Sequence, residues 1–179
     1  MSKLLSIIRI VSISLACLTV SNARAEGVFY GIANMGSTTF DTGEDLKISG
    51  NSWNFGIGYQ INKFSFELLY GSMFHLGTED PSSKMTIDLT STTYLLNYKI
   101  FDGGTFQPVI GIGQTNPSFS MKMDGEETAG DGKTRNIYII GLDIPLEERT
   151  FLTFRYTNTF GDKAEGQISN SSIGAIFKF

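Results

Sequence analysis

The stretch Trp53-Asn54-Phe55-Gly56-Ile57-Gly58-Tyr59-Gln60 decides the fold class, because its residues alternate between two kinds. Every second residue is bulky and apolar, and the residues between them are glycine, asparagine or glutamine. Successive side chains of a β-strand point to opposite faces, so this period of two indicates a strand with one apolar face and one small or polar face. The same alternation recurs in 64–71, 152–157 and 173–179, and a helical period fits none of these stretches.

Turns placed at the clusters of Gly, Asn, Asp and Pro divide the chain into eight predicted strands. The connections between them alternate in length, with long polar segments at 38–51, 75–85, 116–134 and 160–168. Short turns at one end and long loops at the other are typical of a bacterial outer-membrane barrel. The predicted strands are 28–37, 52–60, 64–74, 86–99, 106–115, 135–145, 150–159 and 169–179, with boundaries that shift by a few residues.

The polarity of the alternation fits a barrel in lipid, because the apolar parity is bulky and aromatic while the other parity is small or polar. An eight-stranded barrel has room inside for side chains only. We therefore predict an all-β, eight-stranded antiparallel up-and-down transmembrane β-barrel. The inward positions that relieve crowding are Gly56, Gly58, Gly111, Gly113 and Gly174. The Gly-x-Gly pairs are not nucleotide loops, since a helix follows neither of them.

The N-terminus has the three parts of a cleavable signal peptide. The basic residues Lys3 and Arg9 precede an apolar stretch at 10–20. This stretch has about half the length of the roughly 20 residues that a membrane-spanning helix needs. Ala23 and Ala25 then supply the small residues of an A-x-A site. We expect residues 1–25 to be a signal peptide and residues 26–179 to be the barrel domain.

Composition excludes several classes of function. The 179 residues contain one Cys and one His, too few for a disulfide framework or a protein-ligated zinc site, and we expect neither a metal nor a cofactor. Without the leader and its three basic residues, eleven Lys and Arg remain against eighteen Asp and Glu, a formal net charge of −7. No basic stripe accompanies the 22 aromatic residues, so a nucleic-acid partner is not expected.

The C-terminal strand and two hairpins resemble a known family. The chain stops on Phe179 after an alternating run that includes Phe177, which resembles the terminal signal that the barrel assembly machinery reads. Segments 56–68 and 94–113 are similar to the second and middle hairpins of the opacity-protein-like outer-membrane porin family. The resemblance implies a bacterial outer-membrane location, contact with lipid and lipopolysaccharide, and assembly through Phe179. That family includes adhesins, immune-evasion proteins and structural proteins.

Five charged residues fall on the inward parity of the predicted strands: Glu67, Lys99, Asp143, Arg155 and Lys178. Ionised groups in such a place must be paired or hydrated, because an unpaired buried charge costs several kcal/mol. Glu67 and Arg155 lie at similar distances from their periplasmic turns, so we expect these two to pair. The cluster is interpreted either as a structural salt-bridge network that plugs a narrow lumen or as a gate or proton path. We favour the plug, and expect no open solute pore.

The long outer loops are the regions with enough length and chemical variety to recognise a partner. Two of them are net negative, which indicates either recognition of a basic surface, or shared divalent cations, or simply a solvated, repulsive surface. Their acidic residues are Asp41, Glu44, Asp45, Asp124, Glu126, Glu127 and Asp131.

We expect a monomeric protein with a structural or surface-interaction role and no catalytic residues. The first alternative is an adhesin for host or matrix surfaces. The second is a lipid-modifying barrel enzyme, for which His75 at the outer end of the third predicted strand is the one available general base.

Overall fold

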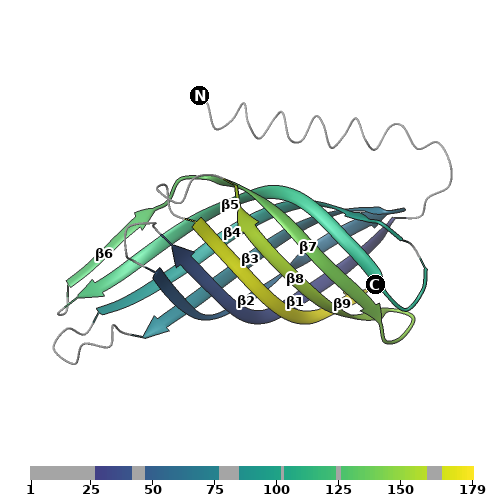
Figure 1. The fold of residues 1–179 in the computed structure, drawn as a ribbon, viewed down its shortest axis with the longest axis horizontal. Coiled ribbons are helices and arrows are strands. Elements are labelled where there is room, and N and C mark those ends of the chain that lie inside the picture. Colours follow the sequence, from purple (N-terminus) through teal and green to yellow (C-terminus); the bar gives the residue numbers. More distant parts are fainter. Residues whose placement is uncertain (1–26, 42–46, 77–84, 102, 124–125, 161–166) are drawn as a thin grey trace.

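The computed structural model describes residues 27–41, 47–76, 85–101, 103–123, 126–160 and 167–179. They form nine strands, eight of which close into an antiparallel barrel (Figure 1). The strands are β1 (Val28–Asp41), β2 (Lys47–Ile61), β3 (Phe64–Leu76), β4 (Met85–Lys99), β5 (Gln107–Met123), β6 (Glu126–Asp131), β7 (Arg135–Pro145), β8 (Thr150–Thr159) and β9 (Gln167–Lys178). The predicted eight-stranded barrel is confirmed, and β6 is an addition to it.

The barrel is closed because β1 pairs with both β2 and β9, and β4 pairs with both β3 and β5. Following paired residues once around the barrel leads from Phe29 to Thr39 of the same strand, a stagger of ten residues. Eight strands with this stagger tilt by about 40° to the barrel axis. Such a barrel encloses a lumen that side chains can fill.

The two faces of the barrel differ as the alternation predicts. Phe29, Ile57 and Ile112 are each about 60% exposed on the outside, whereas Tyr30, Asn97 and other residues of the opposite parity are buried inside. Aromatic side chains gather near both ends of the barrel wall. The Trp53 ring stacks on Phe55 at 5.1 Å between centroids toward the outer end, and the Phe64 ring lies 5.0 Å from that of Tyr98 beside the short turns. This arrangement is the apolar band with aromatic residues that a barrel presents to lipid. Among the described residues, no helix is long and apolar enough to cross a membrane.

The outer ends of the strands differ from the prediction. Much of the expected loop at 38–51 is strand, since β1 continues to Asp41 and β2 begins at Lys47. The expected loop at 116–134 is wrong for most of its length, because β5 continues to Met123 and turns back as β6. Figure 1 shows this β5–β6 hairpin projecting beyond the barrel.

Pro117 marks the point where β5 exchanges one neighbour for another. Up to Thr115, β5 pairs with β7, and from Ser118 it pairs with β6 instead. Proline has no amide hydrogen to donate to a ladder, so a break in pairing costs least at this residue. The chain leaves the β5–β7 ladder of the barrel wall after Thr115 and returns to it at Arg135.

Candidate functional site

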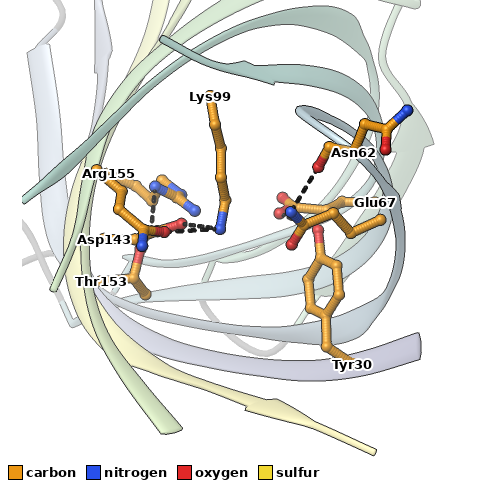
Figure 2. Close-up of polar contacts among 9 residues, drawn as sticks. Tyr30, Asn62, Glu67, Lys99, Asp143, Thr153 and Arg155 are labelled. Carbon is orange, nitrogen blue, oxygen red and sulfur yellow. Dashed lines mark hydrogen bonds and ion pairs between the residues drawn. The ribbon is translucent and has the colours of Figure 1, made fainter. Parts of the chain in front are cut away.

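Asp143, on β7, is the most deeply buried charged residue among those described, with 1% of its surface exposed. Its Oδ1 lies 2.7 Å from Arg155 Nη1 and its Oδ2 lies 3.6 Å from Lys99 Nζ. The Thr153 hydroxyl donates a further hydrogen bond of 2.8 Å to Oδ1. One buried carboxylate is therefore shared between two buried cations (Figure 2).

Lys99 has a second partner within the lumen. Its Nζ donates to Gln107 Oε1 at 3.1 Å and also lies 5.2 Å from the centre of the Phe151 ring. Lys178 Nζ lies 4.5 Å from the centre of the same ring. Cation–π contacts of this kind become stronger when the cation is desolvated, as it is in a narrow lumen. Phe151 thus makes a cation–π contact with both lysines near the periplasmic end.

Glu67 does not pair with Arg155, so that expectation is wrong. Glu67 is 4% exposed, and its Oε1 accepts a 2.7 Å hydrogen bond from the Tyr30 hydroxyl. Its Oε2 has no hydrogen-bond partner among the described residues, and neither has Arg155 Nε. Figure 2 shows Lys99 extending into the space between Asp143 with Arg155 on one side and Glu67 with Tyr30 on the other.

Glycine on the neighbouring strands makes room for these large side chains. A Cβ atom at Gly58 would overlap the Tyr30 ring, and one at Gly141 would overlap the Arg155 guanidinium. Close approach of this kind is a recurring reason for glycine within a strand. The small inward residues of β2 and β7 are therefore part of the site, because they let Tyr30 and Arg155 cross the lumen.

Apolar side chains fill the lumen beside the charges. Leu69 packs against two buried clusters, one of which is Leu95, Ile137 and Ile139. The other cluster is Tyr30, Ile32, Phe151 and Ile176. The space left among the charged residues is about 10 Å³, close to the volume of one water position.

A larger cavity of about 90 Å³ lies in the outer half of the lumen. Leu69, Leu95 and Ile137 belong to its lining, which is otherwise rich in hydroxyl and amide side chains. Asn170 organises one wall, since its Nδ2 donates to Thr38 Oγ1 at 2.7 Å and to Ser52 Oγ at 2.8 Å. Among the described residues, the outer half of the lumen is thus lined by uncharged side chains, and the charged ones lie in the inner half.

Two acidic residues of the outer hairpin, Glu127 and Asp131, are held on one face of β6. Ser118 donates a 2.9 Å hydrogen bond to Asp131, and Ser120 donates a 2.8 Å hydrogen bond to Glu127. Both carboxylate-bearing residues are exposed. Asp41 ends β1 at the same end of the barrel.

Some of the predicted residues lie outside the description. Glu44, Asp45, Asp124 and the whole predicted signal peptide are outside the described residues, as are the side chains of His75 and Glu126. His75 occupies a position on β3 of the same parity as Glu67. At the other end, the Phe179 amide donates to the Phe29 carbonyl at 2.9 Å, and Phe179 and Phe177 are exposed.

Sequence reasoning missed three partners in the lumen, namely Tyr30, Thr153 and Gln107. Each lies on the inward parity of its strand, so the alternation contained the necessary signal. What it lacked was a reason to choose these uncharged residues, which act here as hydrogen-bonding partners of charged ones.

A closed eight-stranded barrel with an apolar exterior, short turns at one end and a charged, filled lumen defines an integral protein of the bacterial outer membrane. Comparison with known families agrees, since residues 10–179 match the outer membrane protein beta-barrel domain family. The chain belongs to this family, which is consistent with the opacity-protein-like resemblance of its hairpins. No curated protein sequence matches the chain significantly.

Solved structures of small barrels share the fold at low sequence identity. Neisserial surface protein A is 18% identical, with a TM-score of 0.70 over 84% of this chain and 97% of that one. The attachment invasion locus protein Ail of Yersinia pestis is 13% identical, with a TM-score of 0.64 over 86% and 99%. The N-terminal barrel of Pseudomonas aeruginosa OprF is 16% identical, with a TM-score of 0.60 over 86% and 100%.

Proposed function

We propose that this protein is a surface-interaction protein whose outer loops recognise a basic partner, while the barrel serves as a closed scaffold. The observation that supports this most directly is the β5–β6 hairpin, which extends the barrel wall beyond the aromatic band and carries exposed acidic residues. The outer loops carry more Asp and Glu than Lys and Arg, so they attract cationic surfaces and repel anionic ones.

The filled lumen argues against transport of solutes. Leu69 and the two buried clusters occupy the interior, and only about 10 Å³ remains among the charged residues. The purified protein should therefore produce no stepwise conductance in planar lipid bilayers. A steady ion conductance would refute the closed scaffold.

Partner recognition is tested by shortening the outer hairpin. Replacing residues 118–131 with a short turn should abolish binding of cells that display the protein to an immobilised lysine-rich polypeptide, and added salt should weaken the wild-type binding. A matched control neutralises Glu147 and Glu148, which lie in the turn between β7 and β8 at the opposite end of the barrel. Equal binding by the shortened protein would overturn the proposal.

The adhesin alternative differs only in the identity of the partner, a host or matrix surface. Ail has been crystallised with the heparin analogue sucrose octasulfate, a polyanion. The acidic outer residues of this chain do not favour an anion of that kind, so a matrix component that binds here should be basic. Binding to immobilised heparin in preference to the lysine-rich polypeptide would contradict this expectation.

The enzymatic alternative depends on His75. That residue occupies a β3 position of luminal parity, whereas a lipid-modifying base has to reach the lipid face. Lipids extracted from cells that express the protein should therefore be identical by mass spectrometry for wild type and His75→Ala. A modification that disappears in the variant would instead favour the enzyme.

A further inference from the structure

Among the described residues, the outer hairpin ends in a strand that pairs on one side only. Among the strands that the structure describes, β6 pairs with β5 alone, and it is the last strand in the sheet order. Below the rim the corresponding neighbour of β5 is β7, which continues to β8 and closes the barrel. The described part of β6 therefore presents a free edge above the barrel.

The direction of the backbone groups on this edge follows from one hydrogen bond. The Gly132 amide donates to the Pro117 carbonyl at 2.8 Å, so this pair is a bonded position. Bonded and non-bonded pairs alternate along an antiparallel ladder. Asp131 and Ala129 therefore occupy non-bonded positions, and their amide and carbonyl groups point away from β5.

We propose that this edge binds an extended, basic polypeptide segment that adds to the sheet as a further strand beside β6. The main-chain groups of Ala129 and Asp131 would pair with the added strand, as in other cases of β-strand addition. The carboxylates of Glu127 and Asp131 stand on one face of the same strand, on either side of Ala129. This inference rests on the proposed recognition of a basic partner, and it adds the manner of binding.

Charge on the edge selects against a second copy of this chain. In an antiparallel pair of copies centred on Ala129, Glu127 of each copy would lie opposite Asp131 of the other. Two pairs of like charges would therefore face each other. Like charges directly opposite each other destabilise a strand pair. A strand with Lys or Arg at those positions would gain from the same carboxylates.

The test uses a short synthetic peptide of alternating Lys and Thr residues, whose binding to the protein in lipid nanodiscs is measured by fluorescence anisotropy. Two further peptides of the same charge carry N-methyl groups on alternate residues. One peptide is methylated on the edge that would face β6, and the other is methylated on the opposite edge. Methylation of the edge that faces β6 should weaken binding about 3- to 10-fold for each hydrogen bond lost, and methylation of the other edge should have little effect.

On the protein side, Ala129→Pro removes an edge amide that does not pair with β5, so the hairpin should persist. Slow hydrogen exchange at the Gly130 amide checks this, because Gly130 is in a bonded position. The variant should bind the unmodified peptide about 3- to 10-fold more weakly. Glu127→Gln with Asp131→Asn should also weaken binding and make it less dependent on salt.

The outcomes separate the two proposals. If both methylated peptides bind like the parent and Ala129→Pro binds like wild type, strand addition is wrong, while charge recognition by the loops stands. If no lysine-rich peptide binds, the proposed function fails as well. Concentration-dependent dimers that Ala129→Pro abolishes would show that the occupant is a second copy, which also overturns the inference.

Discussion

Removing the charge of Asp143 should destabilise the barrel more than any other single change in the lumen. Asp143→Asn keeps the shape of the side chain and a hydrogen-bonding partner for Thr153. It leaves Arg155 and Lys99, both 6% exposed, without the carboxylate that lies 2.7 and 3.6 Å from them. Loss of one partner from a buried ion pair typically costs about 3–5 kcal/mol, so we expect a loss of that size in the free energy of unfolding.

Removing a cation together with the carboxylate should be less harmful. Asp143→Asn combined with Arg155→Met leaves Lys99 as the one cation of this group, still bonded to Gln107 and above the Phe151 ring. Replacing a buried pair by apolar residues of similar size is often close to neutral. The double variant should thus recover about 2 kcal/mol or more relative to Asp143→Asn, an interaction energy within the range seen for direct contacts.

Reversible urea unfolding in lipid vesicles measures these energies, with the single tryptophan, Trp53, as the fluorescence reporter. Thr153→Val is the matched control, because it removes one hydrogen bond to the same carboxylate but leaves the charge in place. Since the bond is to a charged group, the loss should be about 1.5–3 kcal/mol, smaller than that of Asp143→Asn. Equal stability of Asp143→Asn and wild type, or strict additivity in the Asp143–Arg155 cycle, would refute the view that this carboxylate holds the luminal cations in place.

Three further predictions concern the walls and the C-terminus. Ile112→Arg on the lipid face should lower the free energy of unfolding by about 2–4 kcal/mol, whereas Asn136→Arg near the outer rim should lower it by at most about 1 kcal/mol. Similar losses at both sites in urea titrations would mean that the lipid face is misplaced. Gly58→Ala should lower stability by about 1–3 kcal/mol through overlap with the Tyr30 ring, and combining it with Tyr30→Phe should not relieve the loss. Deleting Phe179 should reduce the amount of protein inserted in the outer membrane, seen as unfolded protein in the periplasm, while refolding of the purified variant in vesicles stays normal.

Strand positions and faces could be predicted from the sequence because they depend on local alternation alone. Glu67 and Arg155 are buried in the lumen as their parities indicate. Pairing across the lumen could not be predicted in the same way, since β3 and β8 are separated by β2, β1 and β9. The number of residues from the periplasmic turn was a poor guide to position along the barrel axis. Because the strands are tilted, two residues that are equally far from their turns need not face each other across the lumen.

The observed pair could have been found from one hairpin. The short turn between β7 and β8 fixes their register, which sets Asp143 opposite Thr153 and Arg155 opposite Gly141. A residue and its diagonal neighbour lie within reach of a long side chain. Arg155 therefore meets Asp143 on the adjacent strand before it can reach any carboxylate across the lumen. Local register should be considered before long-range charge matching.

The strand β6 was not predictable from its own residues. Its sequence, Glu126-Glu127-Thr128-Ala129-Gly130-Asp131, contains mostly residues that are depleted in strands, so its conformation depends on pairing with β5. The side-chain hydrogen bonds from Ser118 and Ser120 support that pairing. The one local signal was Pro117, which indicates a break in pairing without saying what replaces the lost neighbour.

The contrast between the barrel and its hairpin has a single physical cause. Within the hydrocarbon, an unpaired amide or carbonyl group costs several kcal/mol, so each of the eight barrel strands must pair on both sides there. Above the rim, water satisfies these groups, and a strand such as β6 can pair on one side only. Proteins usually guard such an edge with charge against uncontrolled pairing, and Glu127 and Asp131 meet that need. Charges that exclude like strands also admit strands of opposite charge, so the protection of this edge and its selectivity for a partner follow from the same two carboxylates.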